Sequence, residues 1–152
     1  MSGKTFVEKI FGAKTGSIVF ATPDIILTHD NTASIAGTFK KMNGEKVKDP
    51  NQLLIVLDHN APPTSAKLAN QYQQVREIVK EQGIEKFYDV GRGICHQIMS
   101  YHARPGQIIV GATAIPAQPG LLMLLQQVST GQNRQDFGNW AKHGSVYRKQ
   151  SR

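Results

Sequence analysis

Three short polar segments of the sequence carry the residue types that acid–base chemistry requires. Each contains a histidine: Thr28-His29-Asp30, Asp58-His59-Asn60 and Cys95-His96-Gln97. An aspartate next to a histidine can orient the imidazole or balance its positive charge, which suits proton transfer near neutral pH. A single His–Asp pair is more often a solvated loop or a helix cap. Three histidine segments, two of them with an aspartate and each following a predicted strand, nevertheless favour a shared pocket.

Side chains suited to metal binding are few. The sequence has one cysteine, Cys95, which cannot form an internal disulfide and supplies no ligand set for zinc or an iron–sulfur cluster. We therefore assign no metal ligand, and we expect Cys95 to be a small buried residue in a reducing, cytoplasmic protein. Gly91-Arg92-Gly93 is a poor dinucleotide fingerprint, because His96 stands where a third glycine belongs. His102 and His143 lack informative neighbours, and we expect both at the surface.

The elements that must position these segments alternate between short apolar runs and helical patterns. We expect strands at residues 25–27, 53–57, 87–90 and 107–110. We expect helices at residues 5–11, 65–82 and 94–101, and a further helix that is capped by Asn31 and carries Ile35, Ala36 and Phe39. This alternation predicts an α/β fold with a mainly parallel sheet. The histidine segments would then lie at the carboxyl ends of strands, where ligands bind.

The pattern changes at about residue 112. Residues 113–152 are rich in Gln, Asn, Gly and Ser, and we expect them to be poorly ordered, with at most one helix near residues 121–128. The net charge is +7, and more than half of the excess lies in this tail, which has five basic side chains and one acidic one. A nucleic-acid-binding tail is therefore a minor alternative function. We find no signal-like segment before the first helix and no apolar run long enough to span a bilayer.

Five segments resemble the aconitase family, in the family's order and at similar spacing. They are Gly3-Lys4-Thr5 with Glu8-Lys9-Ile10, Leu27 to Thr32, Val56 to His59, Gly93 to Gln97, and Pro105 to Ala112. The resemblance covers residues 1–112 and is strongest to the large subunits of 3-isopropylmalate dehydratase and to the related homoaconitases. It implies an α/β fold in the form of an incomplete three-layer aconitase-like amino-terminal domain with a mainly parallel sheet.

The resemblance also implies a hydro-lyase. Such enzymes remove water from a hydroxylated di- or tricarboxylate and add it back elsewhere, as in the isomerisation of 2- and 3-isopropylmalate in leucine biosynthesis, with a [4Fe–4S] cluster as Lewis acid. By motif, Asp58 and His59 would supply the acid, and His29 and Asp30 would lie beside the substrate carboxylates. His96 would support the same pocket. A separate small subunit would complete the site.

This chain departs from the family pattern after Ala112. The family continues into an Asp-Ser-His-Thr run where this chain has Thr113-Ala114-Ile115-Pro116, and the cluster cysteines of relatives lie farther along than this chain extends. Residues 113–128 can be back-translated so that one added base restores a family-like run beginning Asp-Ser-His-Thr. We interpret residues 113–152 as an out-of-frame tail on a chain that is inactive alone. The alternatives are a diverged short protein with its own tail, or a small binding module that pairs with the small subunit.

Overall fold

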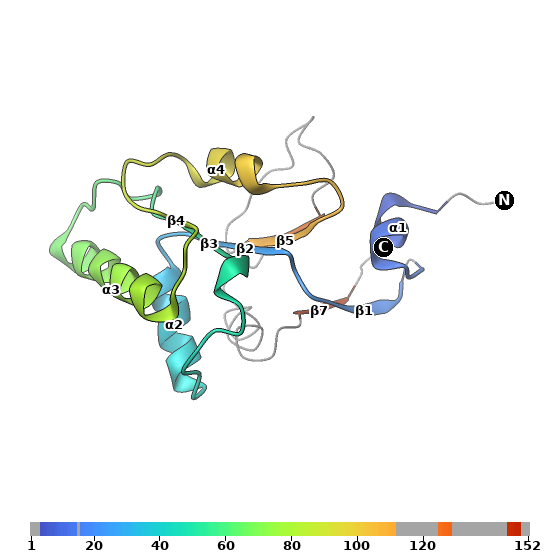
Figure 1. Ribbon diagram of the computed structural model, residues 1–152, viewed down its shortest axis with the longest axis horizontal. Helices are drawn as coiled ribbons and strands as arrows, with labels where there is room; N and C mark the ends of the chain where they lie inside the picture. The colour runs from blue at the N-terminus through green and yellow to red at the C-terminus, as the bar shows by residue number, and fades with distance from the viewer. Residues whose placement is uncertain (1–3, 15, 112–124, 129–145, 150–152) are drawn as a thin grey trace.

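The computed structural model describes residues 4–14, 16–111, 125–128 and 146–149 (Figure 1). The helices are α1 (Phe6–Phe11), α2 (Thr32–Lys41), α3 (Ala66–Gln82) and α4 (Cys95–His102), with a 3-10 helix at Pro50–Gln52. The strands are β1 (Ile18–Ala21), β2 (Ile25–Thr28), β3 (Leu53–Val56), β4 (Phe87–Tyr88), β5 (Ile108–Gly111), β6 (Leu125–Val128) and β7 (Val146–Lys149). Among these residues no helix is both long and apolar enough to cross a membrane.

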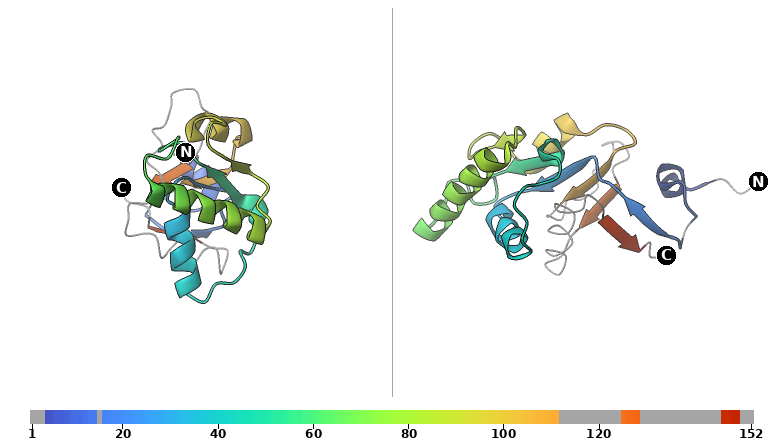
Figure 2. Two further views of the ribbon diagram at one scale, coloured as in Figure 1. Left: turned by 90° about the vertical axis from the view of Figure 1, so that its left-hand side faces the viewer. Right: turned by 60° about the horizontal axis from the view of Figure 1, so that its bottom comes forward.

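Strands β2 to β6 form one parallel sheet in the order β4-β3-β2-β5-β6. Helix α4 covers one face of the sheet, and helices α2 and α3 lie on the opposite face (Figures 1 and 2). The predicted α/β fold with a parallel sheet is therefore confirmed. Strand β1 lies outside this sheet and pairs antiparallel with β7.

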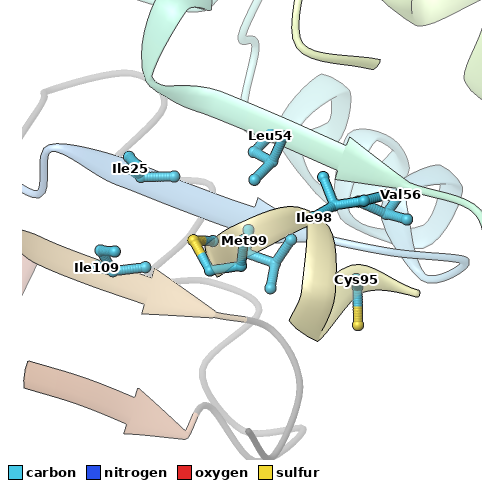
Figure 3. Close-up of a cluster of buried hydrophobic side chains, with 8 residues drawn as sticks. Ile25, Leu54, Val56, Cys95, Ile98, Met99 and Ile109 are labelled. Atoms are coloured by element: carbon cyan, nitrogen blue, oxygen red, sulfur yellow. The ribbon is translucent and has the colours of Figure 1, made fainter. Parts of the chain in front are cut away.

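The apolar run that forms β3 is buried on both faces of the sheet. Leu54 and Val56 belong to the core cluster beneath α4 (Figure 3), whereas Ile55 and Leu57 belong to the cluster beneath α3. Side chains alternate between the faces of a strand, so a central strand with a helix on each side needs an apolar residue at every position. Each such side chain contributes roughly 1.5–3 kcal/mol when fully buried.

The ends of the helices follow the capping signals of the sequence in two cases. In α1, Thr5 and Glu8 form a reciprocal capping box, and in α3 the Ser65 side chain accepts a hydrogen bond from the Leu68 N–H group. Gly83 ends α3 in the left-handed conformation, at φ 68°. Asn31 precedes α2, but the prediction that its side chain caps that helix is wrong, because no such bond forms.

Other elements differ from expectation in extent or type. Strand β4 is only two residues long, and the next residue, Asp89, pairs with Arg76 of α3. In the tail, residues 125–128 form strand β6 along the edge of β5, where a helix or no regular structure was expected. The residues of β6 are Leu-Gln-Gln-Val, so the strand begins where the apolar run of residues 121–125 ends. The rest of the tail, apart from β7, lies outside the described residues.

Candidate functional site

The strand order places one edge of the sheet where ligands commonly bind. From β2 the chain adds β3 and β4 on one side, and then returns to add β5 and β6 on the other. Such a reversal of direction opens a crevice at the carboxyl ends of the central strands. The segments after β2 and β3 therefore emerge side by side, because these two strands are parallel neighbours. The first two histidine segments of the sequence lie at this edge.

The rings of His29 and His59 stack against each other at this edge. Their centroids are 4.1 Å apart, and their planes differ by 19°. The side chain of His59 is 38% exposed and His29 is half-buried, so the pair lies near the surface rather than in the core. The structure thus brings together two histidines that are 30 positions apart in the sequence.

Asp58 holds His59 and the beginning of α4 at the same time. One carboxylate oxygen lies 2.7 Å from Nδ1 of His59, and the other accepts a hydrogen bond of 2.7 Å from the Cys95 N–H group. Helix α4 has no side-chain cap from its own N-cap residue, so Asp58 satisfies one of its free N–H groups from 37 positions away.

The ionisation of Asp58 follows from these contacts. Its side chain is only 7% exposed, and burial alone would raise the pKa. The hydrogen bonds from the Cys95 N–H group and from His59 outweigh that effect and hold the pKa of Asp58 below its ordinary value. Asp58 is therefore a carboxylate at neutral pH, suited to orienting His59 and stabilising its charged form.

Asp30 is held on the other side of the histidine pair. The Asn60 amide donates a hydrogen bond of 2.9 Å to one of its carboxylate oxygens, and the Tyr72 hydroxyl donates to the Asn60 carbonyl at 3.0 Å. Tyr72 is fully buried, and burial together with the neighbouring Asp30 carboxylate raises the pKa of Tyr72. The second oxygen of Asp30 is buried without a hydrogen-bond partner among the described residues.

The loop that carries His29 is closed by local hydrogen bonds. The His29 N–H group donates to the side chain of Asn31 at 3.3 Å, so Asn31 stabilises the loop rather than the helix. The Thr32 hydroxyl, which is buried, contacts both the Thr28 hydroxyl at 2.9 Å and the carbonyl of His29. These bonds fix the backbone between β2 and α2, and with it the direction in which His29 leaves the sheet.

The third histidine segment reaches the site through its backbone rather than its imidazole. The thiol of Cys95 lies 3.2 Å from Nδ1 of His96, and the structure gives no hydrogen bond between His96 and the His29–His59 pair among the described residues. Cys95 is fully buried, as predicted. Burial and the nearby Asp58 carboxylate raise the pKa of the Cys95 thiol to about 12, so it stays protonated at neutral pH.

His102 is not a simple surface residue, contrary to the prediction. It is half-buried, and its Nε2 lies 2.7 Å from the Tyr88 hydroxyl. Burial, with a smaller effect from Lys86, lowers the pKa of His102. This contact ties the end of α4 to β4 and has no link to the catalytic candidates. His143 lies outside the described residues.

Two residues of the site were not singled out from the sequence. Tyr72 lies within the predicted helix at residues 65–82, where its spacing places it among the apolar side chains, but a buried tyrosine also needs a partner for its hydroxyl. Asn60 was noted only as a neighbour of His59. An apolar cavity of about 70 Å³ lies elsewhere, between α2, α3 and the sheet, and none of the five site candidates lines it.

The arrangement can transfer a proton and bind an anion. Since Nδ1 of His59 faces the Asp58 carboxylate, Nε2 is the nitrogen left to exchange a proton with a ligand. His29, stacked beside it, adds a second imidazole that can donate to a carboxylate group. Such a site suits a small polar acid rather than an apolar molecule.

Comparisons with known proteins agree on the identity of the domain. The model of the aconitase family (aconitate hydratase) matches residues 4–113. The chain is 40% identical over 129 residues to 3-isopropylmalate dehydratase large subunit 1 of Methanopyrus kandleri, an alignment that covers 79% of this chain and 31% of that protein. It is 35% identical over 154 residues to the 3-isopropylmalate dehydratase large subunit of Methanoregula boonei, covering 95% of this chain and 36% of that protein.

A third relative carries a different substrate name. The chain is 40% identical over 97 residues to a probable methanogen homoaconitase large subunit of Methanosarcina mazei, covering 62% of this chain and 25% of that protein. In all three comparisons the chain spans about a third of the relative's length or less.

Proposed function

Because the chain belongs to the aconitase family, we propose that it is the amino-terminal part of a hydro-lyase large subunit that acts on a hydroxylated di- or tricarboxylate. The substrate that the relatives favour is isopropylmalate, since two of the three relatives above are named for its dehydratase. The observation that carries the proposal is the stacked His29–His59 pair, with Asp58 bonded to His59, at the carboxyl edge of the sheet. The chain alone is inactive in this account.

In the proposed reaction, His59 is the acid that protonates the departing hydroxyl group. The Asp58 carboxylate holds Nδ1, so the protonated ring is stabilised and presents the proton on Nε2. When the carbon–oxygen bond breaks, that proton leaves with the oxygen as water. When water adds back to the other carbon, the same nitrogen, now unprotonated, takes a proton from that water as its hydroxyl joins the carbon.

His29 and Asp30 position the substrate in this account. A neutral or charged imidazole at His29 can donate a hydrogen bond to a substrate carboxylate, whereas Asp30 accepts a bond from a substrate hydroxyl. Asn60 and Tyr72 hold Asp30 in place. His96, which we expected to act with them, contributes at most through Cys95 and the start of α4, because its described contact is with the Cys95 thiol.

The residues of this chain do not fit an iron–sulfur cluster. A [4Fe–4S] cluster is held by several cysteine thiolates, and this chain has one cysteine. Cys95 is fully buried, and its thiol stays protonated at neutral pH. We therefore assign no step of the reaction to a cluster held by these residues. The base that removes the carbon-bound proton also comes from outside the described residues, and a separate small subunit is the proposed source.

A second candidate function is a small binding module that pairs with such a small subunit. The described domain has core clusters on both faces of its sheet, which supports folding without further chain. Co-purification of the chain with the small subunit of a related dehydratase, in a 1:1 complex without activity, would favour the module. Failure to co-purify would leave the catalytic fragment as the better account.

We further propose that residues 113–152 are translated out of frame. Back-translation of residues 113–128 with one added base gives a run that begins Asp-Ser-His-Thr, in the place where this chain has Thr113-Ala114-Ile115-Pro116. The alignment with the Methanoregula boonei relative covers 95% of the chain and so extends past residue 112. The nucleotide sequence decides whether the tail is out of frame or belongs to the family's own reading frame. A single added base near codon 113 must open a long frame with three further cysteine codons, and the proposal fails if none does.

The proposed activity can be tested by grafting. Residues 1–112 of this chain would replace the matching segment of the Methanopyrus kandleri large subunit, produced together with its small subunit. We expect the graft to interconvert 2- and 3-isopropylmalate and the 152-residue chain to be inactive alone. A folded graft that turns over none of the hydroxylated di- or tricarboxylates would contradict the proposal.

A further inference from the structure

Three ligand-bearing side chains converge at the carboxyl edge of the sheet. One ligand atom from each of His29, Asp30 and His59 lies within 4.8 Å of the others. Two of these residues follow β2, and the third follows β3, so the group spans two elements with independent backbone anchors. From this convergence we propose that His29, Asp30 and His59 bind one divalent transition-metal ion of the zinc and cobalt class.

The donor set is the type that such ions prefer. Two imidazoles and one carboxylate bind Zn²⁺, Co²⁺ or Fe²⁺ more strongly than Ca²⁺ or Mg²⁺, which favour oxygen ligands. Metal–ligand distances of about 2.0–2.2 Å require the three atoms to approach to roughly 3.3 Å of one another. Because their rings are stacked nearly parallel, His29 and His59 must turn out of that arrangement to share an ion. The 38% exposure of His59 leaves its side chain room to turn.

Two of the three ligands, His59 and Asp30, already have the support that metal ligands need. The Asp58 carboxylate at Nδ1 of His59 orients the ring and leaves Nε2 for the ion, which is the carboxylate–histidine–metal arrangement of many zinc sites. For Asp30, the Asn60 amide holds one carboxylate oxygen, while the other is buried without a hydrogen-bond partner among the described residues. A cation beside that oxygen would compensate its lost hydration.

A second group of potential ligands overlaps with the first but fits an ion less well. It consists of Asp58, His59 and Cys95. Both oxygens of Asp58 are already engaged, one by His59 and the other by the Cys95 N–H group. Cys95 is fully buried, and its thiol would have to lose its proton to bind a metal. The group with His29 and Asp30 is therefore the site.

The proposed ion leaves at least one coordination position open, because the chain supplies three ligands. A substrate carboxylate or a water molecule can fill that position. The inference goes beyond the proposed hydro-lyase function and does not depend on it. A metal ion on Nε2 of His59 would in fact block the acid role of that nitrogen, so metal binding and acid catalysis would exclude each other.

The test uses the full 152-residue chain without a histidine tag, titrated with Co²⁺ at pH 7.5 and followed by visible absorption, with Zn²⁺ titrated by calorimetry. We expect one ion per chain. The variants His29→Gln, Asp30→Asn and His59→Gln should each weaken binding by at least tenfold. The matched controls are His102→Gln and Cys95→Ser, which should bind as the parent does. Far-UV circular dichroism of every variant separates lost binding from lost folding.

Two results would overturn the site. One is an absence of saturable binding by a parent chain that is folded. The other is unchanged binding in a folded variant that combines His29→Gln with His59→Gln, since the ion would then lie elsewhere. Loss of binding in Cys95→Ser together with a sulfur-to-cobalt charge-transfer band would assign the ion to the Asp58, His59 and Cys95 group instead. None of these results depends on isopropylmalate turnover, so they leave the proposed activity to its own test.

Discussion

Replacing Asp58 by alanine should lower the free energy of unfolding more than replacing Asp89, an aspartate with a similar set of contacts. Asp58 joins β3, His59 and the start of α4 through two hydrogen bonds of 2.7 Å, and its side chain is 7% exposed. A hydrogen bond to a charged group contributes about 1.5–3 kcal/mol. The bond to His59 is worth less than that, because His59 is partly exposed and water can replace the carboxylate.

The expected cost of Asp58→Ala is about 2–3 kcal/mol, most of it from the Cys95 N–H group left without an acceptor at the beginning of α4. Asp89→Ala is the matched control. Asp89 also pairs with a cation, Arg76, and accepts from a backbone N–H group, that of Val90. Its side chain and that of Arg76 are 36% and 39% exposed, so solvent screens the pair and the expected cost is about 0.5–1 kcal/mol.

The assay is urea unfolding followed by far-UV circular dichroism, with the free energy of unfolding extrapolated to water. The two variants should differ by at least about 1 kcal/mol, with equal slopes against urea. If Asp58→Ala costs no more than Asp89→Ala, the carboxylate does not cap α4 in solution, and the argument that burial decides between the two is refuted.

Three further predictions concern the same region. The pKa of Asp58 is lower in the folded chain than in the unfolded chain, where it is near 3.8. The ionised carboxylate therefore stabilises the fold above that value, and this stabilisation is lost as the pH falls through the folded pKa. The urea midpoints of the parent and Asp58→Asn should converge below about pH 4, and a constant difference would contradict this. Cys95 is fully buried, and the pKa of its thiol is raised to about 12. Iodoacetamide at pH 8, with the modification followed by mass spectrometry, should therefore react with it at least tenfold faster in urea than in the folded chain. Equal rates would mean that α4 does not cover the thiol. Tyr72→Phe should cost about 1 kcal/mol of unfolding free energy, because the Asn60 carbonyl loses its donor, and a neutral effect would show that water replaces the hydroxyl.

Where the sequence predicted the fold well, local rules and tertiary packing agree. The run from Leu53 to Leu57 predicted a strand buried on both faces, and helices cover both faces of β3. Helix α3 runs from Ala66 to Gln82, close to the predicted bounds of 65–82. These features depend on residues within one or two turns of each other, so periodicity and capping preferences suffice to find them.

Contacts between segments that are far apart in the chain could not be predicted from the sequence pattern. The stacking of His29 on His59 depends on β2 and β3 being neighbours, which a single sequence does not reveal. The cap of α4 comes from Asp58, 37 positions earlier, rather than from the residue before the helix. His102 seemed isolated because its partner, Tyr88, lies on another element. The family resemblance identified the segments that meet at the carboxyl edge of the sheet, but the hydrogen-bond partners of their side chains could be identified only from the folded structure.

The most direct test of the proposed function is the effect of His59→Gln on turnover in the grafted enzyme. If His59 carries the proton to the departing hydroxyl, the variant should lose about 10²–10⁴-fold in kcat on 3-isopropylmalate while KM changes little. His102→Gln, in the same graft, should stay within about twofold of the unsubstituted graft, since His102 lies outside the site. A His59→Gln graft that turns over as fast as the unsubstituted graft would contradict the assignment of the acid, and with it the central role of the His29–His59 pair.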